Sequence, residues 1–147
     1  MAPDVELRPA ERGDREYVES TLERCGLPTA DLETALEHLF VCSADGRRIG
    51  VGGLEPCAEY ALLRSVAVEP SARGEGYGTA ITERLLEHAR EDGFSTTYLL
   101  TTTAADFFAD RGFEPVDRAA VPEPVCRTEE FTDICPSTAM CMRHDLE

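Results

Sequence analysis

A strand, a glycine-rich turn and a helix follow one another between residues 62 and 92, and this unit constrains the fold more than any other part of the sequence. The apolar run LLRSVAV leads into EPSARGEGYGTAI, residues 69–81, in which Gly74, Gly76 and Gly78 stand at alternate positions. Glycine weakens strands and helices alike, because it loses the most backbone freedom on folding. A helix N-terminus, however, carries N–H groups without partners, and glycines there let the backbone approach an anion closely. The unit therefore predicts a phosphate-binding loop.

Three kinds of phosphate loop compete for this segment. A P-loop requires Gly-Lys-Ser/Thr, and the chain contains no lysine. A dinucleotide-binding loop requires Gly-x-Gly-x-x-Gly after the first strand of its unit, whereas this chain has Gly-x-Gly-x-Gly after about its third strand. The remaining form, Arg/Gln-x-x-Gly-x-Gly/Ala, is a pyrophosphate loop, and residues 73–78 match it without a gap.

The matching loop resembles motif A of the GNAT superfamily of acetyl-CoA-dependent N-acetyltransferases. The strand, turn and helix around it occur in the family's order, and FFADRGF, residues 107–113, resembles a later family helix. A closer resemblance, over most of the chain, is to the arsenic-resistance-associated branch, which is linked to acetylation of arsinothricin-like or phosphinothricin-like amino acids. The segments that carry it are GLPTADL, GVGGLEP, ALLRSVAV, YLLTTTAADFF and EFTDICPSTAMCM.

The resemblance implies a single domain over residues 1–147, of mixed α/β class, with a central mixed, mostly antiparallel sheet flanked by helices. It implies acetyl-CoA as the cosubstrate, with its pyrophosphate on the loop amides. The pantetheine arm would pair with the preceding strand like an added strand, which requires a strand edge without a neighbour. The residues assigned to the cofactor in this way are Val66, Ala67, Val68, Arg73, Gly74, Gly76, Tyr77, Gly78, Thr79 and Phe108.

The sequence departs from the family pattern at the proton donor. Phe108 occupies the position where many members carry a tyrosine, and Thr101 stands where an asparagine is common. Phenylalanine has no proton to give, so the thiolate either leaves unprotonated or receives a proton from another group, for which Tyr98 and Thr102 are candidates. As the base that takes the proton of the amine, the candidate we favour is Glu55, which closes the strand GVGGLE; an ordinary surface role for this glutamate is the alternative.

An arginine inside an apolar strand predicts a partner, because a buried charge is unfavourable unless it is paired. Arg64 stands in LLRSVAV, and strand alternation would place Arg64 and Ser65 on opposite faces. A substrate carboxylate would suit Arg64, and an internal salt bridge suits it equally well. We take Arg64 and Ser65 as candidate substrate-binding residues, with Arg127 as a weaker second candidate.

Hydrophobic periodicity predicts the other elements. Helices are expected at residues 11–24, at about 30–38 and, closed by Gly93, at 76–92, with a short helix in AADFFADRG. Strands are expected in YALLRSVAV, in TTYLLTT, in TAMCMRH at the end of an irregular tail that begins at 119, and in the hairpin LFVCSADGRRIGVGGLE, which turns at Asp45-Gly46. A mixed sheet with helices on its faces follows.

The charge composition favours a protein built for concentrated salt. The chain carries 29 acidic and 14 basic residues, a formal net charge of −15, and every basic residue is arginine. This charge repels itself in dilute buffer, and molar salt shortens the screening distance to about 3 Å. We therefore expect a haloarchaeal-like, cytoplasmic protein. A polyanion binds nucleic acid poorly, no run of about 18 apolar residues could span a membrane, and the acidic N-terminus does not look like a secretory signal.

Three functions are compared. The first is transfer of an acetyl group from acetyl-CoA to the amino group of a small amino-acid-like substrate. The second is a GNAT domain that acetylates protein N-termini or side chains. The third, of another class, is a thiol-based arsenic- or metal-binding module that uses Cys126, Cys135 and Cys141. Because the cysteines and histidines lack metal-like spacing, we expect no metal and mostly reduced thiols. The expected partner is a small-molecule amine, with no nucleic acid and no membrane, and a homodimer is left open.

Overall fold

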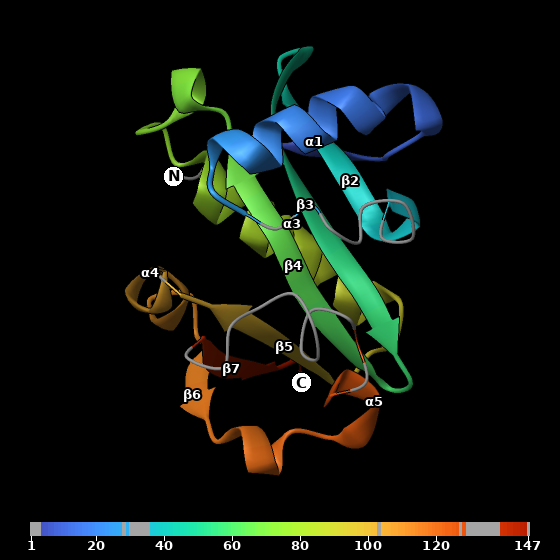
Figure 1. Ribbon diagram of the computed structural model, residues 1–147, viewed down its shortest axis with the longest axis vertical. Helices are drawn as coiled ribbons and strands as arrows, with labels where there is room; N and C mark the ends of the chain where they lie inside the picture. Colours follow the sequence, from blue (N-terminus) through green and yellow to red (C-terminus); the bar gives the residue numbers. More distant parts are fainter. Residues whose placement is uncertain are drawn as a thin grey trace.

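A seven-stranded sheet forms the centre of the molecule, with the strand order β1-β2-β3-β4-β5-β7-β6 (Figure 1). The computed structural model describes residues 4–27, 29, 36–102, 104–126, 128 and 139–146. The strands are β1 (Glu6–Pro9), β2 (Leu39–Ala44), β3 (Arg47–Cys57), β4 (Tyr60–Val68), β5 (Thr96–Thr101), β6 (Glu114–Val116) and β7 (Met140–Asp145). Neighbours β4 and β5 pair in parallel, and the other neighbouring strands pair antiparallel. The predicted fold class, a mixed and mostly antiparallel sheet with helices, is confirmed.

Helices cover both faces of this sheet. They are α1 (Arg15–Arg24), α3 (Tyr77–Glu91), α4 (Ala105–Ala109) and α5 (Glu123–Cys126), with 3-10 turns η1 (Arg12–Asp14), η2 (Leu36–His38), η3 (Pro70–Ala72) and η4 (Arg118–Ala120). In Figure 1, α1 crosses in front of one end of the sheet and α3 lies behind it.

Alternation along β2 divides the core into two layers. Cys42 packs in the cluster that holds Leu85 of α3, whereas Val41 packs with Leu22 of α1. Since successive side chains of a strand point to opposite faces, α1 and α3 cover opposite faces of the sheet. A third cluster lies under the C-terminal turns and includes Val125. The α1 face is thus covered at both ends by different elements.

The strongest sequence signals place their elements as predicted. Asp45 and Gly46 have φ angles of 53° and 78°, which suits a two-residue hairpin turn. Helix α3 directs Ile81, Leu85 and Ala89, each with no exposed surface, into the core. The last strand also forms where TAMCMRH predicted it, as β7.

Several boundaries differ from the prediction. Residues 12–14 of the first predicted helix form a 3-10 turn, and only 15–24 are α-helical. The second predicted helix lies partly outside the described residues; its end, Leu36–His38, is a 3-10 turn, and Leu39 already belongs to β2. The tail contains η4 and α5, because backbone hydrogen bonds such as Ala120 N to Asp117 O (2.9 Å) close short turns between its prolines. Strands β1 and β6 were not predicted.

Within the described ranges, none of the helices combines the length and apolarity needed to cross a bilayer.

Candidate functional site

Strands β4 and β5 begin as neighbours and then part. Their parallel pairing covers three residue pairs, from Tyr60↔Thr96 to Leu62↔Tyr98. Beyond that point, no strand among the described residues pairs with Leu63–Val68 on the β5 side. This is the unpaired edge that the predicted pantetheine site requires.

A β-bulge interrupts β4 at Ser65. The β3–β4 register passes from Gly53↔Arg64 to Val51↔Ala67, so one residue of β3 faces two of β4. Ser65 takes a φ of 57°, in the left-handed region. The left-handed backbone at Ser65 breaks the alternation of side chains: Arg64 and Ser65 both line the same cavity, and Arg64 Nε donates to Ser65 Oγ at 3.3 Å. The prediction that Arg64 and Ser65 lie on opposite faces is therefore wrong.

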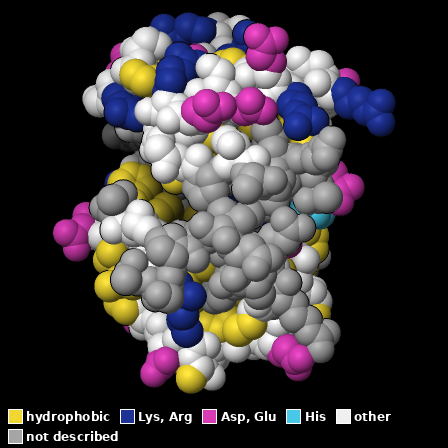
Figure 2. Space-filling model, viewed as in Figure 1, with side chains coloured by type: hydrophobic (Ala, Val, Ile, Leu, Met, Phe, Trp, Pro, Cys, Tyr) yellow, Lys and Arg dark blue, Asp and Glu magenta, His cyan; other side chains and the backbone are white. Residues whose placement is uncertain are grey.

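The parting of the strands opens a cavity of about 350 Å³ between them. Its walls come from the end of α1, from β4, from the glycine loop, from β5 and from α4. The predicted site residues that line it are Arg64, Ser65, Val66, Ala67, Val68, Arg73, Gly78 and Phe108. Figure 2 shows hydrophobic side chains around a recess, below an end of the molecule where arginines gather.

The glycine loop and the start of α3 hold the other predicted cofactor residues, Gly74, Gly76, Tyr77 and Thr79, which do not line this cavity. Gly74 and Gly76 have φ angles of 85° and 83°, which L-residues with side chains seldom adopt. Gly78 packs next to Phe107 of α4, since a Cβ built there would lie in van der Waals contact with the ring, at 3.4 Å. Gly74 and Gly76 thus shape the loop, and α4 packs against the first turn of α3 beside it.

Glu55 and Arg64 form an ion pair beside the cavity. Arg64 Nη1 lies 3.1 Å from Glu55 Oε1, and the two side chains are 3% and 21% exposed. The absence of a side chain at Gly53 makes room for the arginine, since a Cβ there would lie 3.1 Å from Arg64 Cγ. The internal salt bridge, which the sequence left open beside a substrate carboxylate, is therefore formed. Glu55 itself does not line the cavity; it meets the site through Arg64.

The two candidate proton donors, Tyr98 and Thr102, lie in different parts of the molecule. Phe108 lines the cavity with its ring edge-on to Phe107 and Phe113. Thr101 and Thr102 line it too, and Thr101 Oγ1 accepts the N–H of Ala104 at 3.0 Å. Tyr98 instead packs against Tyr60 under the C-terminal turns, where burial raises the pKa of its hydroxyl. Of the two predicted replacements, the structure brings only Thr102 to the cavity.

Sequence reasoning missed the wall supplied by α1. Cys25, Gly26 and Leu27 line the cavity, and the Cys25 thiol donates to Val68 O at 3.4 Å. Arg73 turns toward the same place, with Nη2 3.3 Å from Cys25 Sγ. The helix-ending Gly26 was a signal for the end of α1, but nothing in the sequence indicated which strand that end would meet.

Three further cysteines, Cys42, Cys57 and Cys141, are buried, and Cys126 is partly exposed. Burial raises the pKa of Cys42 and Cys57 to about 12 and that of Cys141 to about 11, which favours the neutral thiol. The described residues contain no group of three cysteine, histidine or acidic side chains that could hold a metal ion. Cys135 and Arg127 lie outside the described residues.

The sequence relatives are acetyltransferases. A family model described as Acetyltransferase (GNAT) domain matches residues 35–115. The amino-acid acetyltransferase of Salmonella arizonae is 33% identical over 94 residues, which is 63% of this chain and 21% of that protein. The enzyme of the same name from Pseudomonas putida is 38% identical over 86 residues, 57% of this chain and 20% of that protein. The chain thus spans about a fifth of the length of these curated relatives.

Solved structures share the fold over nearly the whole chain. N-acetylglutamate synthase from Neisseria gonorrhoeae, complexed with coenzyme A and N-acetyl-glutamate, superposes with a TM-score of 0.82 at 23% identity, covering 100% of this chain and 36% of that chain. Rv2747 from Mycobacterium tuberculosis, in a complex that contains CoA, gives a TM-score of 0.79 at 25% identity, covering 97% and 99%.

The parted strands, the bulge and the glycine loop are found on a fold shared with CoA-bound proteins, and the family model covers more than half of the chain. The sequence prediction of the family is confirmed: this chain belongs to the GNAT family of acetyltransferase domains.

Proposed function

We propose that this domain transfers an acetyl group from acetyl-CoA to the amino group of a small amino acid. The observation that carries the proposal is the unpaired edge of β4, Leu63–Val68, which faces the cavity and leads to the glycine loop. Such an edge can bind an extended chain of amides by adding it to the sheet. The amides of a pantetheine arm have this chemistry.

The residues present fit acetyl-CoA. Val66 and Val68 offer main-chain groups along the cavity, and Gly74 and Gly76 hold a loop whose turn leads into the N-terminus of α3. N–H groups of a first helical turn have no partner within the helix and favour anions, so this turn suits the pyrophosphate. When bound, acetyl-CoA supplies an activated acyl group as a thioester.

The reaction forms a bond between the amine nitrogen and the acetyl carbonyl carbon, and the carbon–sulfur bond breaks with its electron pair left on sulfur. The proton of the amine must go to a base. We propose Glu55 for this role, acting from beside the cavity, with Arg64 fixing its carboxylate through their 3.1 Å contact. The sulfur leaves as a thiolate and takes a proton from solvent, because Phe108 cannot give one and an ordinary thiol has a pKa near 8.5.

The relatives favour an amino acid as the acceptor, since those in Salmonella arizonae and Pseudomonas putida are named amino-acid acetyltransferases. Within this class, we propose arsinothricin-type or phosphinothricin-type amino acids, on the sequence resemblance alone. Because Glu55 pairs with Arg64 in this structure, a substrate carboxylate would have to share Arg64 with Glu55. Ser65, beside it, stays the other proposed substrate-binding residue.

A turnover screen in molar KCl tests the proposal. The protein is incubated with acetyl-CoA and one acceptor at a time, and both free CoA thiol and N-acetylated product are measured. The panel holds common amino acids, their phosphinic and arsonic analogues, and short peptides with free N-termini. Acetylation of an amino acid supports the proposal. Acetylation of peptides alone would favour the protein-directed alternative, and thiol release without any acetylated product would contradict both.

A further inference from the structure

Arg111 holds an unusual place for a cation in this chain. It follows α4, and its guanidinium lies over the Phe107 ring, 4.0 Å from the ring centroid. Nη1 donates to Phe107 O at 2.8 Å, and both Nε (at 3.1 Å) and Nη2 donate to Thr79 Oγ1. Its side chain is 22% exposed. The guanidinium is thus held against the first turn of α3, the turn that follows the glycine loop.

The close partners of Arg111 are neutral oxygens, whereas Arg8 and Arg64 meet carboxylates. Arg8 lies 2.8 Å from Asp14 and Arg64 lies 3.1 Å from Glu55. The carboxylate of Asp110, on a side chain that is 81% exposed, lies 3.9 Å from Arg111 Nη1. In a chain with 29 acidic and 14 basic residues, Arg111 thus places a guanidinium beside the loop with no carboxylate closer than 3.9 Å among the described residues.

The loop needs such a charge if it binds a pyrophosphate. Its own arginine, Arg73, turns toward Cys25, and Arg47 lies 4.0 Å from Glu75 of the loop. Hydrogen bonds from a guanidinium to phosphate are roughly twice as strong as those between neutral groups, and its planar fork can bind two oxygens at once. The Phe107 ring and carbonyl fix the orientation of that fork in advance.

We propose that Arg111 binds the pyrophosphate of the cosubstrate together with the first-turn amides of α3 and the hydroxyl of Thr79. The inference rests on the proposed function. It adds a residue that lies 32 positions away from Thr79 in sequence and outside the glycine loop.

Ligands that differ only in their phosphates test this role. Wild type, Arg111→Gln and Arg111→Lys are compared, with Arg84→Gln as the control, since Arg84 lies on the exposed side of α3 and pairs with Glu87. Dissociation constants for CoA and for 3′-dephospho-CoA are measured by calorimetry at one fixed KCl concentration. The rise in Tm at millimolar pantetheine reports binding without phosphate.

Arg111→Gln should weaken CoA and 3′-dephospho-CoA alike by at least about tenfold, which corresponds to about 1.4 kcal/mol. The rise in Tm caused by pantetheine should be the same in Arg111→Gln as in wild type. Arg111→Lys should recover part of the lost affinity for CoA, and Arg84→Gln should bind all three ligands like wild type. An equal loss with pantetheine would show that Arg111 only supports α4. A loss with CoA that disappears with 3′-dephospho-CoA would assign Arg111 to the 3′-phosphate and overturn the proposal. If wild type binds none of the three ligands, the proposed function itself fails.

Discussion

Ser65 is the residue at which the central strand becomes irregular, and much of the site depends on it. Its positive φ accompanies the extra residue of the β-bulge opposite β3. The same bulge brings the Ser65 hydroxyl to Arg64 Nε, which in turn belongs to the guanidinium that Glu55 binds. A single backbone conformation therefore links the bend of β4 to the ion pair beside the cavity.

Substitution of Ser65 should separate the backbone requirement from the hydroxyl. Ser65→Val places a β-branched side chain at a φ of 57° and should lower the free energy of unfolding by about 1–3 kcal/mol. Ser65→Gly keeps the conformation without strain and should stay within about 1 kcal/mol of wild type. Urea unfolding in constant molar KCl measures both. Equal losses in the two variants would show that the hydroxyl, and not the left-handed backbone, sets the stability.

Glu55→Gln tests the proposed base. The variant keeps the shape of the side chain but cannot accept the proton, so kcat/KM should fall by about 10²–10⁴-fold near neutral pH. The loss should shrink at high pH, where the free amine deprotonates without help. A pH–rate profile with the best acceptor measures this, and Glu83→Gln, a change on the exposed side of α3, is the control. A profile that matches wild type throughout would remove Glu55 from the mechanism.

At the scale of elements, the strand–loop–helix unit is the part whose structure is most fully determined by its own local sequence. Glycines at 74 and 76 are required by backbone angles, and the inward residues of α3 repeat at helical spacing. The loop can therefore be altered without redesign of the core, because Gly74 and Gly76 are exposed.

Gly76→Asp should weaken acetyl-CoA binding at least about tenfold, since it places a carboxylate where a pyrophosphate is proposed. Gly76→Asn is the matched control, because asparagine has nearly the same shape, tolerates positive φ and carries no charge. Calorimetric titration should show a much larger loss for Asp than for Asn. Equal losses would mean that strain, and not charge, causes the effect. Unchanged affinity in a folded Asp variant would exclude this loop as the phosphate site.

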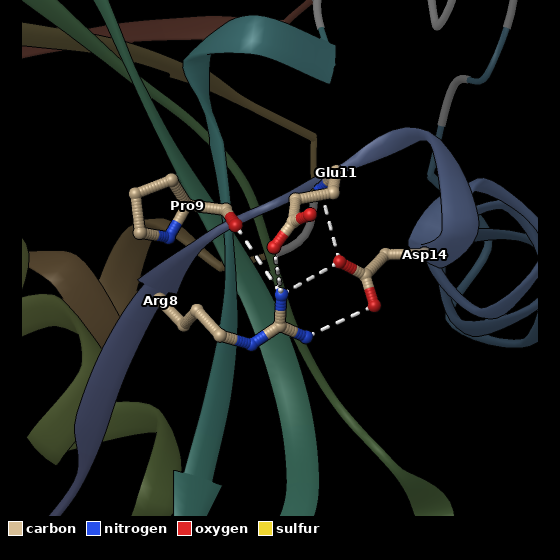
Figure 3. A network of polar contacts seen from close by, with 4 residues as sticks. All are labelled: Arg8, Pro9, Glu11 and Asp14. Atoms are coloured by element: carbon tan, nitrogen blue, oxygen red, sulfur yellow. Dashed lines mark hydrogen bonds and ion pairs between the residues drawn. The ribbon is translucent and has the colours of Figure 1, made fainter.

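An ion pair between Arg8 and Asp14 links β1 to the turn that precedes α1 (Figure 3). Arg8 binds Asp14 through two hydrogen bonds of 2.8 and 2.9 Å, and the N–H of Glu11 donates to the same carboxylate. The Arg8 hydrogen bonds lower the pKa of Asp14 from 3.8 to about 2. The pair therefore stabilises the fold above about pH 4, and its contribution is lost as pH falls from about 4 to 2.

Arg8→Gln should lower Tm above about pH 4, and the difference from wild type should shrink as pH falls to about 2, where Asp14 becomes protonated in the wild-type protein as well. Thermal unfolding at constant KCl across this range measures the effect, with Arg84→Gln as a control that lacks this pH dependence. A Tm difference that persists unchanged at about pH 2 would mean that packing of the Arg8 stem, and not the ion pair, is responsible.

The elements that could be predicted from the sequence are those determined by local patterns, and the others depend on contacts between distant segments. Helix α3 and the hairpin carry local patterns, and they form where expected. Strand β1 has a single half-buried residue, Leu7, so it shows no alternation, and its pairing with β2 decides its structure. In the site, the contiguous loop was predictable, whereas the contact of Arg111 with Thr79 depends on how α4 packs. The bulge at Ser65 likewise left no mark in a strand pattern read by alternation.

At the scale of the whole molecule, charge is the dominant feature. A net charge of −15 is spread over a chain whose exposed ion pairs, such as Arg84–Glu87 at 3.5 Å, are worth little individually. Self-repulsion should therefore destabilise the fold in dilute buffer, and salt should screen it.

We predict loss of tertiary structure at about 0.1 M KCl and its recovery toward about 3 M, with a rising Tm between these limits. Near-UV and far-UV circular dichroism during thermal unfolding measures it. Sucrose is the control, because it stabilises folded proteins by exclusion but does not screen charge. A Tm that stays flat across the KCl series would show that the halophilic interpretation is wrong.

The parting of β4 and β5 also divides the sheet into two parts. Four strands lie on one side of the junction and three on the other, and along the ladder only three residue pairs join the described halves. The core on the α3 side spans the junction, since Leu99 of β5 and Leu63 of β4 share a cluster with α3. The two parts of the sheet are therefore held together on the α3 side, while the cavity lies between their separated strand ends. A ligand with amide groups, bound along the unpaired edge of β4, would lie in the gap between β4 and β5. The row of hydrogen bonds across the sheet would then continue through the ligand.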